Sequence, residues 1–568
     1  MNIIATLRYE ILKTIQKNYQ LDREQQQAIV IHLNLDPSKP FGDMSCNAAM
    51  VLAKMLGKNP RQLAQEIKDL LLGDQEPLFV KTIRDVEIAG PGFLNITVHK
   101  DVWAKVAGEL WDQKNSYFTL PEYEKKHRYL IEFVSANPTG PLHLGTGRGG
   151  IIGDVLGNVL AFVGHTVLKE YYINDAGNQM KLLGKSVLVR CKQALGIQDE
   201  LPEEGYAGEY ITELAAHCRS EFGDDVINKD ESFFSDYAKN EMLKNIKTDL
   251  QTFGVQFDSW FSEKSLHEDG SIEQAIEVLR SKDLVYESEG ALWFKSTEFG
   301  DEKDRVIRKQ NGELTYIAAD IAYHKNKFDR GYDILIDILG QDHHGYVKRL
   351  KGTMLALDYE KAFDVILYQL VTIKENDVAI KMSKRAGTFT KLDDIVQTVG
   401  RDVARFFYLN RKADAHLEFD LATALKKTDE NPVFYIQYAY VRTNSLLEKA
   451  ALDEHLQKIV EQLASGSLNQ THLETMMLLV QDPEIMVLRK IVSLSDALLS
   501  VAKTYQTHVI AYYAWELALV FHNYYANNRI VDPTNHDLSA ARICLVQLVR
   551  QTLGIGLDLL GISKPEKM

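Results

Sequence analysis

Cysteine is scarce in this chain, and the few cysteines lie far apart. The 568 residues contain four of them, with no C-x-x-C pair: Cys46, Cys191, Cys218 and Cys544. Zinc ribbons and disulfide frameworks both need cysteines at short, recurrent spacings. The sequence therefore argues against both and favours a reducing, cytoplasmic setting.

A long hydrophobic run at the start of the chain and an excess of positive charge are also missing. The first segment, MNIIATLRYEILKTIQKNYQ, alternates apolar and polar residues at helical spacing and has no cleavage-site pattern. It predicts a packed helix rather than a signal peptide or a membrane span, and we expect no membrane partner. The formal net charge of −14 gives no overall footprint for nucleic acid. A binding face can be local, however, so a nucleic-acid partner stays open.

The chain is too long for one hydrophobic core, and its pattern of apolar and polar residues changes twice along the sequence. Residues 1 to about 115 mix amphipathic helices with VEIAGPGFLNITV, a turn followed by a β-like run, which predicts a small α+β domain. Residues 120 to about 425 alternate β-like runs with helices, which predicts a mostly parallel, Rossmann-like sheet. A polar, helical insertion is expected at about 180–290. Residues 430–568 are helical throughout, which predicts an all-α bundle. The fold class is thus multidomain α/β.

One stretch, SANPTGPLHLGTGRGGIIGD, follows the strand-like run RYLIEFV. A buried strand, a turn and a glycine-rich helix place backbone N–H groups where an anion can bind. Glycines recur every four residues on one face of this helix: Gly145, Gly149, Gly153 and Gly157. Either a ligand or the neighbouring sheet approaches that face closely, and the stripe alone does not decide between them.

Two motifs in this region resemble the signatures of class I aminoacyl-tRNA synthetases. Pro-Leu-His143-Leu-Gly145 is similar to the H-x-G-H signature, and Lys381-Met-Ser-Lys384, about 240 residues later, is similar to KMSK. The resemblance implies that His143, Lys381 and Lys384 are catalytic and stabilise charge as pyrophosphate leaves. It implies an ATP site formed by His143, Gly145, Thr146, Asp342, His343, Lys381, Met382, Ser383 and Lys384.

The similarity narrows to the arginyl-tRNA synthetases of bacterial type. The segments that carry it run along the whole chain: IEFVSANPTGPLHLG, EYYINDAGNQ, EKDRVIRK, TYIAADIAYHKNKFDRGYD, DHHGY, NPVFYIQYA and GISKPEKM. The family implies a two-step ligase that acts on L-arginine, ATP with Mg²⁺ and tRNA(Arg), with activation that needs bound tRNA. It implies a tRNA-contacting domain at 1–115, a catalytic domain at 120–425 and an anticodon-binding domain at 430–568. We expect a monomer.

The chemistry of arginine selection gives an independent check. A guanidinium is planar, permanently charged and best held by carboxylates. Glu132 lies on the strand before the glycine-rich helix, and Asp320 follows the apolar, strand-like run Tyr316-Ile-Ala-Ala. Acids on apolar segments are seldom buried without a partner, so the two carboxylates are expected in one pocket, although structural ion pairs would explain them too. By resemblance Tyr316 lines that pocket, and Asn137 and Gln341 contact the polar end of the amino acid.

The run Asp342-His343-His344 invites a metal interpretation. Adjacent histidines on an extended segment would point in opposite directions, and no third ligand has zinc-like spacing. We therefore expect no protein-bound metal, and the resemblance places Asp342 and His343 beside the adenylate. Mg²⁺ is expected to arrive with ATP, held largely by phosphates and water.

Aromatic residues are frequent in the C-terminal helices, where most are expected in the core. Splayed RNA bases stack on aromatic and arginine planes, and the resemblance makes Tyr435, Tyr438 and Met568 the candidates for the anticodon. Phe93 and Asn95 are candidates in the N-terminal domain. Cations that could follow the RNA backbone are Arg148, Arg385, Arg401, Arg405, Arg411, Lys426 and Lys427, although charged runs are more often solvated faces.

Thr146 stands where the family has its second signature histidine. A threonine removes a possible cation and keeps one hydroxyl that can donate and accept. Three alternatives follow: an active enzyme, an active but slow one, or a catalytically impaired paralogue that binds tRNA. The other motifs favour an active synthetase. A small-molecule adenylyltransferase with the same fold is a further rival, but it has no use for the helical C-terminal domain.

Overall fold

The computed structural model describes residues 2–36, 41–73, 77–120, 124–359, 362–375, 378–379 and 391–568. Its N-terminal domain contains a four-stranded antiparallel sheet of order β1-β2-β4-β3 packed against helices. The chain enters it through α1 because Asn2 caps the helix at Ala5 N, 2.8 Å away, and apolar residues recur every three or four positions. The elements are α1 (Ile3–Tyr19), α2 (Arg23–Ala28), β1 (Ile31–Leu33), β2 (Met44–Cys46), α3 (Ala48–Leu56), α4 (Pro60–Gly73), α5 (Pro77–Thr82), β3 (Ile83–Ala89), β4 (Phe93–Val98), α6 (Lys100–Gln113) and η1 (Lys114–Phe118).

The central domain is built on a five-stranded parallel sheet of order β12-β11-β5-β6-β7. Its strands and the helix that covers them are β5 (Arg128–Phe133), α7 (Leu144–Phe162), β6 (Thr166–Ile173), β7 (Ser259–Ser262), β11 (Ile334–Gly340) and β12 (Phe363–Tyr368). The chain leaves β5 toward β6 on one side, while β11 pairs with the other side of β5. The sheet therefore has a switch point between β5 and β11, where α/β proteins bind ligands at the carboxyl ends of the strands.

The predicted insertion is mostly helical but also returns one strand to the sheet. Three helices form a separate hydrophobic cluster: α8 (Asn178–Ala194), α9 (Glu209–Phe222) and α10 (Glu231–Thr252). The expected helical insertion did not include β7, which completes the edge of the parallel sheet. Four residues, SWFS, are too short to give a clear β pattern between helices.

The rest of the central domain covers the sheet on either side of the switch point. Its elements are α11 (Glu263–Glu268), α12 (Ser271–Ser281), β8 (Val285–Ser288), β9 (Ala291–Phe294), β10 (Arg305–Arg308), α13 (Tyr316–Asp329), η4 (Gln341–His343), α14 (His344–Ala356), β13 (Val371–Glu375), β14 (Val378–Ala379), α15 (Leu392–Val399), α16 (Arg401–Tyr408), β15 (Leu417–Asp420) and α17 (Leu421–Ala424). Two sequence expectations were wrong here. The run from Tyr316 to Asp320 is helical, and Asp342-His343 lies in a 3-10 turn rather than an extended segment.

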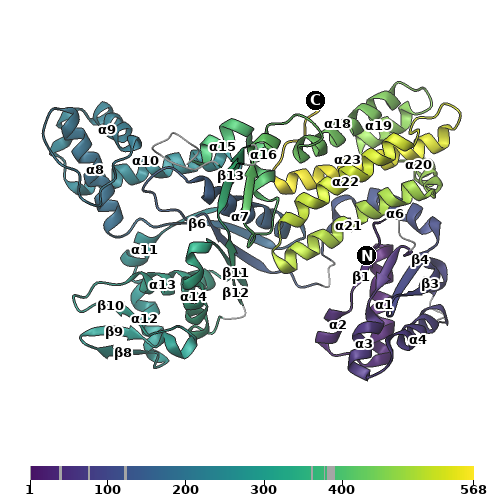
Figure 1. The fold of residues 1–568 in the computed structure, drawn as a ribbon, viewed down its shortest axis with the longest axis horizontal. Coiled ribbons are helices and arrows are strands. Elements are labelled where there is room, and N and C mark those ends of the chain that lie inside the picture. Colours follow the sequence, from purple (N-terminus) through teal and green to yellow (C-terminus); the bar gives the residue numbers. More distant parts are fainter. Residues whose placement is uncertain are drawn as a thin grey trace.

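The C-terminal domain is a helical bundle, drawn in yellow-green at the upper right of Figure 1. It comprises α18 (Pro432–Ala451), α19 (Gln457–Ser465), α20 (Gln470–Thr475), α21 (Asp482–Thr504), α22 (His508–Asn527) and α23 (His536–Leu560). α18 starts sharply because Asn431 caps it and Pro432 occupies its first position. α23 is the one helix of the described residues long and apolar enough to cross a membrane, but 83% of its apolar window is buried inside the protein. It is the central helix of the bundle.

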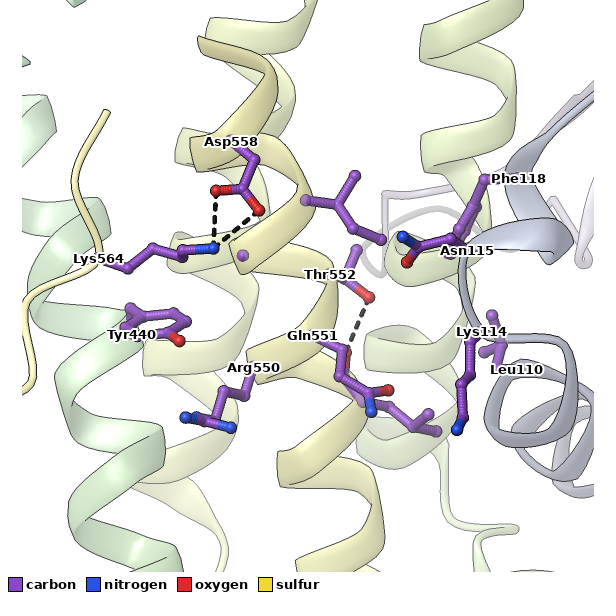
Figure 2. A pocket seen from close by; sticks show the side chains of 13 residues that line it. Leu110, Lys114, Asn115, Phe118, Tyr440, Arg550, Gln551, Thr552, Asp558 and Lys564 are labelled. Carbon is purple, nitrogen blue, oxygen red and sulfur yellow. Dashed lines mark hydrogen bonds and ion pairs between the residues drawn. The ribbon is translucent and has the colours of Figure 1, made fainter. Parts of the chain in front are cut away.

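The N-terminal domain docks on the bundle rather than on the parallel sheet. In Figure 1 it lies beneath α21, and ion pairs join the two: Arg8 with Asp496 at 2.6 Å, Lys100 with Asp482 at 2.6 Å, and Arg489 with the buried Asp43. Figure 2 shows a cavity of about 290 Å³ at this junction, between Lys114 and Phe118 on one side and α23 on the other. None of the predicted site residues lines it.

Candidate active site

A second cavity, of about 650 Å³, opens at the switch point of the parallel sheet. Residues that follow β5 and β11 line it, together with the start of α7 and one face of α13. Nine residues singled out from the sequence line this one cavity: Glu132, Asn137, His143, Gly145, Thr146, Asp320, Gln341, Asp342 and His343. Segments more than 200 residues apart in the chain thus meet where the topology places a ligand.

The turn after β5 is strained. Val134 has φ of +68° and Ser135 has φ of +40°, in the left-handed region that a β-branched residue rarely adopts. Two contacts from β6 hold the turn: the Tyr171 hydroxyl donates to the carbonyl of Ala136 at 2.6 Å, and the backbone N–H of Tyr172 donates to Ser135 Oγ at 3.1 Å. Strain of this kind persists only where its surroundings fix it, and it aims the next residues into the cavity.

His143 begins the glycine-rich helix. Its side chain is exposed, and its Nδ1 accepts a hydrogen bond from the backbone N–H of Gly145 at 3.1 Å. With the ring accepting at Nδ1, a neutral imidazole carries its proton at Nε2. Thr146 lies half-buried one residue further, where its backbone N–H donates to the His143 carbonyl at 2.9 Å. The start of α7 therefore combines a helix N-terminus, an imidazole and a hydroxyl, all groups suited to an anion.

The opposite end of the cavity is acidic. The carboxylate of Asp320 is half-buried and makes no hydrogen bond or ion pair with any residue in the described part of the chain. Burial, reinforced by the carboxylates of Glu263, Glu132 and Asp337, raises its pKa to about 7. A carboxylate that lacks a partner and faces a cavity is unfavourable when ionised, and a bound cation would relieve the cost.

Glu132 belongs to a buried network beside Asp320. It accepts from Lys327 Nζ at 2.5 Å, and the same ammonium donates to Asp337 at 2.9 Å. Asp337 also contacts His324 Nε2 at 2.8 Å. Both readings of Glu132 from the sequence therefore hold in part, since this carboxylate makes a structural ion pair and also lines the cavity.

Comparisons with known proteins decide the family. The family model of the class I (R) tRNA synthetase catalytic domain matches residues 109–424, which is more than half of the chain. The chain belongs to the arginyl-tRNA synthetase family. The models of the arginyl-tRNA synthetase N-terminal domain and of the DALR anticodon-binding domain match residues 5–98 and 436–568.

Similar proteins agree with this membership and with the predicted fold class. An arginine–tRNA ligase from Oleidesulfovibrio alaskensis is 43% identical over 93% of this chain and 94% of its own length. The arginine–tRNA ligase of Bacillus subtilis is 40% identical over 96% of both chains. The solved Thermus thermophilus arginyl-tRNA synthetase shares the fold, with a TM-score of 0.73 at 20% identity over 98% of this chain and 99% of that one. The multidomain α/β architecture predicted from the sequence is confirmed.

The glycine stripe of this synthetase serves packing more than ligand contact. Gly145 lines the cavity, but an added Cβ at the next three glycines would overlap side chains from three strands of the sheet: Tyr368 of β12, Phe133 of β5 and Lys169 of β6. The two alternatives left open by the sequence therefore divide along the helix. The first glycine faces the ligand cavity, and the others allow α7 to lie close to the sheet.

The KMSK motif, Lys381 to Lys384, and Arg385 lie outside the described residues. The first described residue after this segment, Lys391, forms an antiparallel bridge with His143, and Leu392 N–H donates to the carbonyl of Leu142 at 2.9 Å. Where the described chain resumes after the KMSK motif, at Lys391, it therefore lies directly beside His143.

Tyr316 is the predicted pocket residue that the structure does not bring to the cavity. It occupies the first position of α13 with 70% of its surface exposed, four residues before Asp320. Four other tyrosines line the cavity instead: Tyr172, Tyr323, Tyr346 and Tyr368. The sequence analysis did not single them out, because aromatic residues at strand or helix spacing usually lie in the core. Only their acidic neighbours in the cavity distinguish these four tyrosines.

The residues proposed for the anticodon lie around a separate cavity of about 600 Å³ in the bundle. Tyr438 and Met568 line it, exposed by 39% and 52%, whereas Tyr435 packs beside it with its ring 4.5 Å from His522. Arg442, not singled out from the sequence, has its guanidinium 4.5 Å from the Tyr438 ring and 4.4 Å from the Tyr525 ring. This cavity therefore presents a stack of planar groups.

Two of the suggested surface cations are buried. Arg148 is fully buried, and its guanidinium donates to the carbonyls of Gln369 and Lys412 at 2.8 Å each. Arg405 is also fully buried and donates to Asp154 at 2.5 Å and to the carbonyl of Leu560 at 2.7 Å. Neither can reach an RNA backbone, so both expectations were wrong. Arg401, Arg411, Lys426 and Lys427 are exposed and stay candidates.

Phe93 and Asn95, the N-terminal candidates, differ in exposure. Phe93 is 37% exposed at the start of β4, whereas Asn95 is buried and is hydrogen-bonded with Ser45 at 2.5 Å. Among the described residues no group of three or more histidine, cysteine, aspartate or glutamate side chains is arranged to hold a metal.

Proposed function

We propose that this chain is an arginine–tRNA ligase that joins L-arginine to the 3′ end of tRNA(Arg) at the expense of ATP. The observation that supports arginine as the substrate is the carboxylate of Asp320, which pairs with none of the described residues and lies beside Glu132 in the same cavity as the His143-capped helix. One end of the cavity suits a cation and the other a phosphate. Free arginine and ATP together supply both groups.

The acidic end is assigned to the arginine side chain. Asp320 and the second oxygen of Glu132 would accept the N–H groups of a guanidinium, in the fork-like manner that distinguishes it from an ammonium. Asn137 and Gln341 line the same cavity, and we assign them to the α-amino and carboxylate groups of the substrate. The tyrosines of the cavity wall enclose the apolar stem of the substrate. Tyr316 stays a candidate that would have to turn inward.

The opposite end is assigned to ATP. His143, Gly145 and Thr146 would contact the phosphates, and Asp342 and His343 would lie beside the adenylate. Lys381, Met382, Ser383 and Lys384 are assigned to the triphosphate from the motif, and Lys391 joins their segment to His143. Mg²⁺ is inferred to bind with ATP, through its phosphates and water.

The reaction proceeds in two steps. A carboxylate oxygen of arginine attacks the α-phosphorus of ATP and pyrophosphate leaves, which forms arginyl-AMP. A terminal ribose hydroxyl of the tRNA then attacks the activated carbonyl carbon, and AMP leaves. The protein contributes position and positive charge rather than a covalent nucleophile. His143, Lys381 and Lys384 stabilise the negative charge that builds on the phosphates.

The other two domains are assigned to tRNA. We infer that residues 430–568 bind the anticodon through Tyr435, Tyr438 and Met568, and that residues 1–115 contact the tRNA elsewhere. The stack of Tyr438, Arg442 and Tyr525 supports this assignment, because unpaired bases pack on such planes. We also infer a cytoplasmic monomer. Sedimentation of the free chain and of its tRNA complex tests the last point.

The deciding experiment is charging of purified tRNA with labelled arginine by the full chain. We expect charging with arginine and not with lysine, pyrophosphate exchange only when tRNA is present, and loss of both on Lys384→Ala. Tight tRNA binding without any charging would instead indicate the catalytically impaired paralogue, for which the comparisons give no support. Pyrophosphate exchange without tRNA would indicate a small-molecule adenylyltransferase.

A further inference from the structure

A buried lysine lies directly behind the acidic end of the active-site cavity. Lys327 is fully buried in the last turn of α13, and it is absent from the residues that line the cavity. Its ammonium bonds to Glu132 and Asp337 and lies 4.3 Å from the centre of the Tyr323 ring. These three neighbours do line the cavity. Lys327 therefore supports the cavity wall from outside.

The contacts of Lys327 fix one oxygen of Glu132 and leave the other available. Nζ donates to Glu132 Oε2, whereas Glu132 Oε1 has no hydrogen-bond partner among the residues that the structure describes. The Tyr323 ring is itself fixed, because its hydroxyl donates to the buried Glu170 at 2.8 Å. The ammonium is thus held by three neighbours, and the carboxylate of Glu132 is anchored through one oxygen. A carboxylate held in one plane suits a planar guanidinium, whereas an ammonium needs no such plane.

The charges around the cavity also depend on Lys327. Three carboxylates lie at the acidic end: Glu132, Asp320 and Asp337. The carbonyl of Asp320 can only accept, so His324 Nδ1 donates to it at 2.8 Å. The contact of His324 Nε2 with Asp337 therefore contains a proton shared by the two. The three ionised carboxylates that line the cavity carry three negative charges. The proton between His324 and Asp337 and the ammonium of Lys327 offset two of them, so one negative charge remains for the single positive charge of a guanidinium.

Burying a lysine costs hydration and side-chain entropy, and an apolar residue would fill the same space more cheaply. Burial by itself lowers the pKa of Lys327, but the carboxylates of Asp337 and Glu132 outweigh it and raise the pKa above its ordinary value. The side chain is therefore charged throughout the working range of pH. Because Lys327 lies directly behind the cavity wall, its positive charge acts on the carboxylates that line the cavity.

We propose that Lys327 is a positioning residue for arginine specificity: it fixes Glu132 to receive a guanidinium and leaves the cavity with the charge of one monocation to bind. This inference rests on the proposed function, because it assigns the acidic end to the arginine side chain. Lys327 itself touches neither substrate nor ATP.

The test compares Lys327→Met with Lys325→Met in the full chain. Lys325 lies two residues away on the same helix and pairs with Asp329 at 2.6 Å, so the control makes the same substitution outside the network. Lys327→Met lets Glu132 rotate or take a proton. We expect the KM for arginine to rise about 10- to 100-fold, the size of a lost charged hydrogen bond. The preference for arginine over lysine, measured as the ratio of kcat/KM, should fall by about tenfold or more.

A merely structural role would not give this pattern. The KM values for ATP and tRNA and the preference shown by Lys325→Met should stay within about twofold of the wild type. If Lys327→Met does not fold, Lys327→Gln serves the same comparison, since it retains one donor to Glu132 and loses the charge. An unchanged arginine preference in the folded variant, or equal losses for all three substrates, would overturn the proposal. Failure of the wild type to charge tRNA would instead refute the proposed function itself.

Discussion

The two cavities of this synthetase, at the switch point of the sheet and in the helical bundle, differ in whether their charged groups have partners before a ligand binds. At the switch point of the sheet, Asp320 offers a carboxylate that no described residue pairs with, so the free site is short of positive charge. In the bundle, Arg442 is already stacked between Tyr438 and Tyr525, so its cation is satisfied before any ligand binds. The first cavity selects by charge, and the second by flat surfaces that need little rearrangement.

The largest expected effect is confined to the first cavity. Asp320→Asn removes the carboxylate that faces the guanidinium, and kcat/KM for arginine should fall about 100- to 1000-fold. Affinity for tRNA, measured by filter binding, should change by less than about twofold, because the bundle cavity is untouched. Equal losses in both would show that the cavities are not independent.

The corresponding test of the second cavity is a substitution in the helical bundle. Tyr438→Ala removes one plane of the stack, and the KM for tRNA should rise about 10- to 100-fold, since stacking of one base contributes about 1–3 kcal/mol. The KM for arginine at saturating tRNA should stay unchanged. A matched control is Tyr286→Ala, an exposed tyrosine of β8 in the central domain that lies outside the bundle cavity. Similar effects of the two substitutions would argue against the anticodon assignment.

The two cavities should also differ in their response to pH. Asp320 has a raised pKa of about 7, so in the free enzyme the carboxyl is largely protonated at pH 6 and ionised at pH 8. A guanidinium binds the ionised form, so arginine affinity should rise about tenfold from pH 6 to pH 8 and then level off. Calorimetric titration with arginine measures this. In Asp320→Asn the slope should disappear, and a slope that remains would assign the titration to another group.

The smallest effect is expected at Thr146. This residue is half-buried and lines the cavity together with His143. Thr146→His adds a possible cation near the phosphates, so kcat for pyrophosphate exchange should change by less than about tenfold while the KM for arginine is unchanged. A gain of more than 100-fold would mean that the natural chain lacks an essential group.

The sequence predicts which residues line the active-site cavity better than it predicts the secondary structure and burial around them. His143, Glu132 and Asp320 meet as expected because strand ends and a glycine-rich helix leave few topological choices. The helix at Tyr316 was missed because an apolar run of four residues suits a strand as well as a buried helix. Lys327, Arg148 and Arg405 could not be foreseen as buried, since cations are buried only when distant segments supply carboxylates or carbonyls.

Arg405 connects the middle of the glycine-rich helix to the last helix of the chain. It binds Asp154 on α7, the carbonyls of Phe253 and Gly254 before β7, and the carbonyl of Leu560 at the end of α23. On the ribosome, the last of these partners emerges 155 residues after Arg405. At about 5–20 residues per second, that interval is roughly 8–30 s. During this interval the Arg405 guanidinium of the nascent catalytic domain lacks one of its carbonyl partners. The contacts that connect α7 to the rest of the protein through Arg405 are therefore complete only when translation is nearly finished.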